Sequence, residues 1–201
     1  TDFISNVSHE FKTPLNAIEG YASLLQEHQQ TQEEQNEYIE KILFNTRRLS
    51  SLTGNILLLS KINTQSIKPQ RTSFRLDEQV RQAILALEQK WTEKNIDLDV
   101  ELDKIQYSGY ESLLFHVWTN LIDNAIKFDP PDGMICLRMR QSGGSVIFTI
   151  EDNGPGINPE EQERIFHKFY QSDSSRKMDG NGLGLSLVKQ IVELSGGTVS
   201  V

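Results

Sequence analysis

The chain has 201 residues, of which 37% are hydrophobic and 24% charged, and its formal net charge is −8. This composition excludes a largely disordered protein, and the acidic balance argues against a surface for nucleic acid or anionic lipid. Its single cysteine, Cys136, excludes an internal disulfide and a multi-cysteine metal site, and the absence of a bilayer-length apolar run or signal peptide predicts a cytoplasmic location, with any membrane segment outside these residues.

Residues 1–66 are predicted to form two amphipathic helices separated by a polar bend at residues 27–31. In each helix apolar side chains recur at spacings of three and four, which is a heptad seam. Because two narrow seams bury little surface alone, we expect the hairpin to pair with a second copy as a dimeric four-helix bundle. The seams comprise Ile4, Val7, Phe11, Pro14, Ile18, Tyr21 and Leu25, then Tyr38, Ile42, Asn45, Leu49, Leu52, Ile56 and Leu59.

Residues 66–70 break this pattern and read as a linker to a second domain over residues 71–201. There we expect a short strand at 74–76 and a left-handed stop at Asn95. Between them we expect one helix, capped by Asp77, that carries Val80, Ile84, Leu87 and Trp91 on one face. Further on we expect a strand at 96–102, a helix at 111–128, strands at 134–140 and 146–151, and a helix at 183–194. This order predicts an α/β sandwich, with one mixed sheet and helices on one face. Since Val201 falls within a strand-like pattern, we expect the last strands of the sheet to be missing from the chain.

The helix at 111–128 carries a polar stripe of His116, Asn120, Asn124 and Lys127 beside an apolar face. Asparagine is a mediocre helix former, so two of them one turn apart need a reason. A solvated helix face is one explanation. The functional alternative is an amide oxygen for Mg²⁺ and a lysine for phosphate on one edge.

Two glycine-rich stretches follow. In the first, Asp152 ends a strand, where its carboxylate can accept a hydrogen bond from an exocyclic amine such as that of adenine, and Gly154 and Gly156 permit close approach to a flat ligand. The second, GNGLGL at residues 180–185, opens a helix whose free amides favour phosphate oxygens. Either stretch alone is explained as well by a tight turn. The sequence contains neither a P-loop motif nor an early Rossmann unit.

The stretch SHEFKTPL at residues 8–15 places His9 opposite the helical seam, on the exposed side. A solvated histidine is the simple explanation. The functional explanation is a neutral imidazole. One ring nitrogen attacks phosphorus while Glu10 takes the proton from the other ring nitrogen. Glu10 and Thr13, three residues apart, are both expected to flank His9 on the exposed side. Pro14 removes a helical hydrogen bond, so the helix can bend there.

Taken in their order along the chain, the motifs resemble the catalytic core of the sensor histidine kinases of two-component systems. SHEFKTPL resembles the histidine box of their dimerisation and phosphotransfer domain. The stripe and glycine stretches resemble the asparagine box and the two glycine boxes of their GHKL-type ATP-binding domain. Residues 165–170 resemble its phenylalanine box and residues 172–181 its mobile ATP lid. Arginines common in and after the phenylalanine box are here Lys168, which keeps a charge, and Gln171, which does not.

The resemblance implies Mg·ATP-dependent phosphorylation of His9, assisted by Glu10, followed by transfer to an aspartate on the receiver domain of a response regulator. Thr13 would help water attack the phosphorylated regulator. Asn124 and Asn120 would bind Mg²⁺. The implied nucleotide-binding residues are Asn120, Asn124, Lys127, Asp152, Gly154, Gly156, Lys168, Gly180, Gly182, Gly184 and Leu185.

The resemblance further implies that the chain is the cytoplasmic part of a membrane-bound sensor. Two other functions stay open. One is an ATP-gated conformational ATPase of the same fold, in which His9 is incidental. The other is a dimeric scaffold without catalysis.

Overall fold

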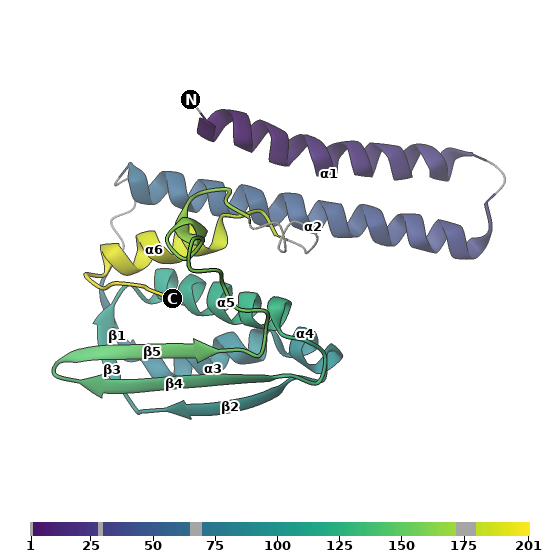
Figure 1. The fold of residues 1–201 in the computed structure, drawn as a ribbon. Helices are drawn as coiled ribbons and strands as arrows, with labels where there is room; N and C mark the ends of the chain where they lie inside the picture. The colour runs from purple at the N-terminus through teal and green to yellow at the C-terminus, as the bar shows by residue number, and fades with distance from the viewer. Residues whose placement is uncertain (1, 28–29, 65–69, 172–179) are drawn as a thin grey trace.

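The computed structural model describes residues 2–27, 30–64, 70–171 and 180–201, and its N-terminal part is an antiparallel helical hairpin (Figure 1). The hairpin comprises α1 (Asp2–Gln26) and α2 (Gln32–Asn63). Thr31 caps α2: its Oγ1 accepts a hydrogen bond from the Glu34 amide at 3.2 Å, and Glu34 Oε2 accepts one from the Thr31 amide at 2.8 Å. This reciprocal capping box sets the start of α2. Residues 28–29 of the predicted bend lie outside the described residues.

The predicted seams lie between the two helices. Every predicted seam residue is at least partly buried except Ile4, which is 78% exposed. Helix α1 continues unbroken through Pro14, which is itself buried. The predicted hairpin is therefore confirmed, with a seam on α1 that begins at Val7.

The second part of the chain contains helices and strands in mixed order. Its elements are β1 (Thr72–Arg75), α3 (Leu76–Ala86), α4 (Glu88–Glu93), β2 (Asp97–Leu102), β3 (Gln106–Gly109), α5 (Glu111–Phe128), β4 (Met134–Ser142), β5 (Ser145–Glu151), the short 3₁₀ helix η1 (Arg164–Phe166) and α6 (Gly184–Leu194). Strand β4 pairs in parallel with β2 and antiparallel with β5, while β1 pairs antiparallel with β3. The mixed α/β character is confirmed. The prediction of one sheet is wrong, because the described strands form two hydrogen-bonded groups.

The core lies between the three-stranded sheet and the helices. Alternate residues of β4 (Ile135, Leu137 and Met139) are fully buried, as the period of two in a strand requires. They belong to one apolar cluster with residues of α5 and α6, such as Ile122 and Leu187. Figure 1 shows α5 and α6 stacked between the strands and the hairpin, and α6 contacts α2. Helix α6 thus lies between α5 and the hairpin.

Two local predictions near Asp77 are wrong. The N-cap of α3 is Arg75, and the Asp77 carboxylate is fully buried, where it accepts hydrogen bonds from Arg75 at 2.6 and 2.8 Å and from Arg81 at 2.9 Å. Hydrogen bonding from Arg75 is the main reason that the pKa of the Asp77 carboxyl lies far below its ordinary value. The helix also divides at Leu87 into α3 and α4. The left-handed stop at Asn95 is confirmed by its φ of 54°.

At the other end of the chain, residues 197–201 are not in a strand, so that prediction is wrong too. Most of the predicted linker (65–69) and most of the predicted ATP lid (172–179) lie outside the described residues, and the domain division at 66–71 stays a prediction. Within the described ranges, no helix combines the length and the apolar character that a bilayer span requires.

Candidate functional site

The predicted polar stripe lies along one edge of α5. Asn120, Asn124 and Lys127 are partly buried there, while Ile122 on the other side of the helix is fully buried in the core. The Asn120 amide group donates from Nδ2 to the His116 carbonyl at 2.7 Å, and its Oδ1 faces Gly184. The edge therefore presents an amide oxygen and an ammonium group on one helix.

The second glycine box lies against this edge. A Cβ added to Gly184 would lie 2.7 Å from Asn120 Oδ1, and one added to Gly180 would lie 2.7 Å from Lys127 Nζ. Both distances are too short for a real Cβ, so glycine is what allows the backbone to approach the stripe. Helix α6 begins at Gly184, and Leu185 behind it is partly buried. The structure thus brings the asparagine box and the second glycine box together.

The phenylalanine box is joined to the same loop. The Phe169 amide donates to the Gly182 carbonyl at 2.8 Å, and a Cβ on Gly182, whose φ is +64°, would lie 2.7 Å from the Phe169 carbonyl carbon. Next to it, the Leu183 amide donates to Asn181 Oδ1 at 3.1 Å. Because the obstructing atoms at Gly182 are backbone, this glycine sets the loop shape more firmly than its neighbours do.

The first glycine box follows β5. Asp152 is exposed, and its Oδ1 accepts a hydrogen bond from the Gly154 amide at 2.9 Å in a tight turn. A Cβ on Gly154 would lie 3.0 Å from the Phe128 carbonyl at the end of α5, and Gly156 has a φ of +71°. The turn is therefore packed against the end of the asparagine-box helix while the Asp152 carboxylate stays accessible to a ligand.

Three residues that the sequence analysis missed support this turn and the end of α5. Asp129 is 2% exposed, and its Oδ1 accepts a hydrogen bond from the Asn153 amide at 2.7 Å. The Asn153 side chain accepts another from the Met134 amide at 2.9 Å. Lys94 Nζ donates to the carbonyls of Ile126, Lys127 and Asp129 at 2.8–2.9 Å and so satisfies the end of α5. Their partners are distant in sequence, so no local spacing signals these roles.

The histidine box lies on α1. His9 is exposed, as predicted, and the Thr13 hydroxyl donates to the His9 carbonyl at 3.4 Å. The prediction that Glu10 flanks His9 on the exposed side is wrong. The Glu10 side chain is 24% exposed and turns towards α2, where its carboxylate forms an ion pair with Arg48 at 3.3 Å. The acid next to the candidate phosphoacceptor therefore has a charged partner within the hairpin.

Lys168 lies towards the hairpin as well. Its ammonium group is 5.4 Å from the centre of the Phe3 ring, and that ring is 5.5 Å from the ring of Phe169. These contacts join the phenylalanine box to the start of α1. The nucleotide-binding role of Lys168 stays a prediction.

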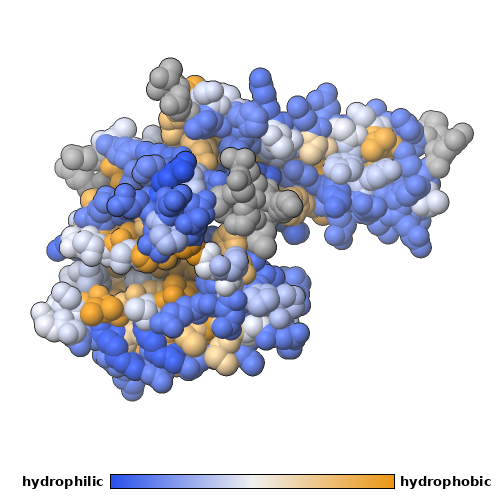
Figure 2. Space-filling model, viewed as in Figure 1, coloured by the Kyte–Doolittle hydropathy of each residue, from blue (hydrophilic) through white to orange (hydrophobic). Residues whose placement is uncertain are grey.

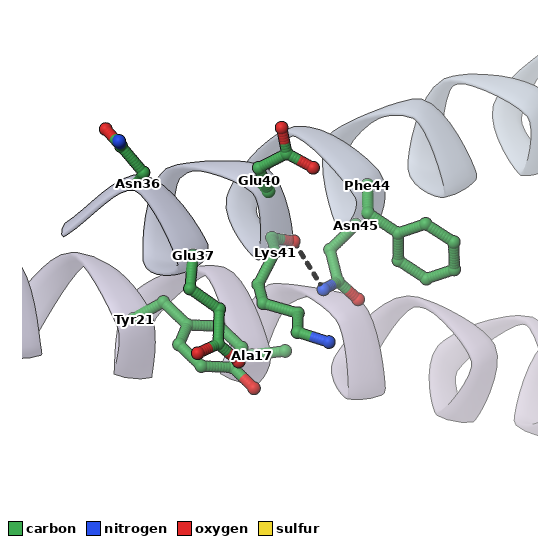
Figure 3. A pocket seen from close by; sticks show the side chains of 8 residues that line it. All are labelled: Ala17, Tyr21, Asn36, Glu37, Glu40, Lys41, Phe44 and Asn45. Atoms are coloured by element: carbon green, nitrogen blue, oxygen red, sulfur yellow. Dashed lines mark hydrogen bonds between the residues drawn. The ribbon is translucent and has the colours of Figure 1, made fainter. Parts of the chain in front are cut away.

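The cavities mark other parts of the surface. A groove of about 630 Å³ runs between α1 and α2, lined by side chains such as Tyr21, Lys41 and Phe44 (Figure 3). Its lining includes no residue of the asparagine box or of the two glycine boxes. A smaller cavity of about 410 Å³ adjoins the first glycine box at Phe128 and Gly154. Among the described residues, no group of three or more His, Cys, Asp or Glu side chains could hold a metal ion.

Comparison with known proteins agrees with this geometry. Residues 1–65 match the family model of the His Kinase A (phospho-acceptor) domain. Residues 109–201 match the model of the Histidine kinase-, DNA gyrase B-, and HSP90-like ATPase. The fold and the site thus define a phosphoacceptor hairpin joined to an ATP-binding domain. The chain belongs to the histidine kinases, as the catalytic core of a sensor histidine kinase.

Individual relatives support the assignment. The chain is 37% identical over 199 residues to the heme sensor protein HssS of Staphylococcus saprophyticus, covering 99% of this chain and 43% of that protein. It is 33% identical over 205 residues to the sensor-like histidine kinase SenX3 of Mycobacterium tuberculosis, covering 100% of this chain and 50% of that protein. The chain thus spans half or less of the length of these relatives.

Solved structures resemble nearly the whole chain. The histidine kinase ThkA, in complex with the response regulator protein TrrA, superimposes with a TM-score of 0.76 at 26% identity over 98% of this chain and 55% of that chain. Full-length ShkA in complex with AMPPNP superimposes with a TM-score of 0.68 at 28% identity over 98% of this chain and 41% of that chain.

Proposed function

We propose that this chain transfers the γ-phosphoryl group of Mg·ATP to His9 and then passes it to an aspartate on the receiver domain of a response regulator. The observation that carries the proposal is the convergence of Asn120, Lys127, Gly180 and Gly184 at one edge of α5, beside a hairpin with an exposed histidine. The similarity to ThkA, which was solved with a response regulator, supports the second step.

The proposed chemistry is a nucleophilic displacement at phosphorus. One nitrogen of neutral His9 forms the N–P bond as the bond from phosphorus to the ADP oxygen breaks. Glu10, which in this structure pairs with Arg48, would turn to accept the proton from the other ring nitrogen. Lys127 and the amides at the start of α6 would stabilise the phosphate oxygens. The exposed Asp152 carboxylate would accept a hydrogen bond from the adenine amine.

Asn124 and Asn120 fit a role in holding Mg²⁺, because neutral amide oxygens can complete a coordination shell made mostly by phosphate and water. The Asn120 Oδ1 that faces the second glycine box supports this fit. The cation would neutralise charge on the triphosphate.

The proposal includes three partners or settings. We infer that the hairpin forms a homodimer, that the receiver domain docks near His9, and that the chain works as the cytoplasmic part of a membrane-bound sensor. Thr13 beside His9 would also serve dephosphorylation of the regulator.

Incubation with γ-labelled ATP tests the function. We expect acid-labile, base-stable label on the wild-type chain and none on His9→Gln. His167→Gln is the control for the site of labelling, because His167 is also exposed but lies in the phenylalanine box, outside the histidine box; it should still carry acid-labile label. Free phosphate without labelled protein would indicate a conformational ATPase instead. Neither product would indicate a scaffold.

A further inference from the structure

One guanidinium from the hairpin joins the histidine box to the second glycine box. Arg48 lies on α2, and its Nη2 donates both to Glu10 Oε2 and to the Gly180 carbonyl, each at 3.3 Å. Glu10 is 38 residues away in sequence and Gly180 is 132 residues away. The Arg48 and Glu10 side chains are 25% and 24% exposed, so water screens this pair only in part.

The Gly180 carbonyl is a meeting point of several groups. Gln171 Nε2 donates to the same oxygen at 2.9 Å, and the α-carbon of Gly180 faces Lys127 Nζ. Gln171 stands where arginine is common in the family. In this chain the guanidinium at this oxygen comes from the hairpin.

Apolar contacts surround this polar link. Phe3 packs on Phe169, Lys168 lies over the Phe3 ring, and Leu52 on α2 is 1% exposed within the common core cluster. A charge-assisted hydrogen bond at the edge of such packing has more effect than one in open solvent, because the packing limits how far its partners move apart.

We propose that Arg48 is a positioning residue for phosphoryl transfer, which holds Glu10 and the phosphoacceptor helix against the second glycine box of the same chain. The inference rests on the proposed function. Among the described residues, Arg48 contacts Glu10 and the Gly180 carbonyl, so it acts through the histidine box and the backbone of the second glycine box. Its loss frees the histidine box from the loop that is expected to hold the phosphates.

Autophosphorylation kinetics of four chains test this role: wild type, Arg48→Ala, Arg48→Lys and Arg47→Ala. For a coupling of this kind between partly exposed groups, Arg48→Ala should lower kcat by about 10-fold, with the KM for ATP nearly unchanged. Arg48→Lys should recover most of the rate, because only one nitrogen of Arg48 makes both contacts. Arg47, the exposed neighbour on α2, is the matched control and should have no effect.

A double-mutant cycle separates positioning from general destabilisation. In the Glu10→Gln background, Arg48→Ala should reduce the remaining rate by much less than it does alone, since its partner is already lost. Equal losses in both backgrounds, an equal loss in Arg47→Ala, or a wild-type rate in Arg48→Ala would overturn the inference.

Hydrogen exchange gives a readout that does not need activity. Without nucleotide, Arg48→Ala should exchange faster than wild type in peptides that cover residues 3–13 and 180–185, while the core of β4 is unchanged. Unchanged exchange in both peptides would refute the proposed contact even if the chain is active. A wild-type chain that shows the contact but takes up no label would refute the proposed function and leave the contact standing.

Discussion

Replacement of Gly184 by alanine is expected to weaken ATP binding while the fold stays intact. Gly184 is the first residue of α6, and an added Cβ would lie 2.7 Å from Asn120 Oδ1 and 3.6 Å from its Cγ. The obstructing atoms are the end of a side chain rather than backbone. The chain can therefore relieve the overlap by turning the Asn120 amide away from its present position, which removes the oxygen expected to serve the nucleotide.

The substitution is expected to change the free energy of unfolding little and the ATP affinity strongly. Alanine in a helix is more stable than glycine by about 1 kcal/mol, which offsets the loss of the Asn120 hydrogen bond to His116, about 0.5–1.5 kcal/mol. The free energy of unfolding should therefore change little. A hydrogen bond to a charged group contributes about 1.5–3 kcal/mol, so its loss corresponds to an ATP affinity about 10- to 150-fold weaker.

Titration with ATP by calorimetry and urea unfolding of the same samples measure the two effects. Gly54→Ala is the matched control, because a Cβ there meets nothing within 4 Å. It should bind ATP as the wild type does and unfold at a slightly higher urea concentration. Wild-type affinity in Gly184→Ala would refute the placement of Asn120 in the ATP site, and a large loss of stability would show that the overlap is not relieved by one side chain.

Other residues give predictions of the same kind. Asn124→Asp should abolish labelling from Mg·ATP, because it adds negative charge close to phosphate oxygens; full labelling would remove Asn124 from the site. Asp77→Asn should lower the free energy of unfolding by about 1.5–3 kcal/mol at pH 7. Since Arg75 lowers the pKa of Asp77 in the folded chain, this contribution is present above the unfolded pKa near 4 and is lost as the pH falls below it. Urea unfolding should then show a smaller difference between the two chains at pH 3, and an unchanged difference would contradict the assignment. Glu10→Gln should slow labelling of His9 by about 10²-fold, whereas Thr13→Ala should slow only loss of label from a phosphorylated regulator; equal loss of labelling in both would refute that division.

The long periodic segments could be predicted from the sequence because their signals are local. The period of three and four identified α1, α2 and α5, and the glycine at the start of α6 marked its N-terminus. The left-handed Asn95 was predictable for the same reason, since it depends on one residue at a helix end. The box motifs were likewise visible as short local patterns.

Several of the misses depend on contacts that no sequence periodicity indicates. Strand β3 has only four residues and is defined by its pairing with β1, more than thirty positions earlier. Asp77 looked like a cap, but the Ile105 amide and two arginines compete for its carboxylate. The pairing of Glu10 with Arg48 crosses the hairpin, and no periodicity indicates it.

Helix α2 makes two sets of contacts, one with α1 and one with α6. Leu52 and Leu59 belong to the predicted seam, but each is 1% exposed within a single chain and lies in the cluster that includes α6 residues. A charge at either position would disrupt the chain itself and would not isolate an effect on dimerisation. The apolar residues of α2 that remain exposed, and so could contact a second chain, include Ile39, Leu43 and Leu57. Figure 2 shows that the visible face of the hairpin is mainly hydrophilic, with a few apolar patches.

These exposed residues give a cleaner test of the proposed homodimer. Ile39 and Leu43 lie one turn apart on α2 and are 46% and 47% exposed. Glutamate at both positions remains hydrated in a monomer but would bury unpaired charge in a dimer that uses this face. By light scattering, the wild type should have twice the 22.9 kDa mass of one chain, and the Ile39→Glu, Leu43→Glu variant should approach 22.9 kDa. Ile147→Glu is the control, since Ile147 is 52% exposed on β5, away from the hairpin, and should stay dimeric. A wild-type mass of one chain would refute the homodimer, and a dimeric double variant would refute the use of this face.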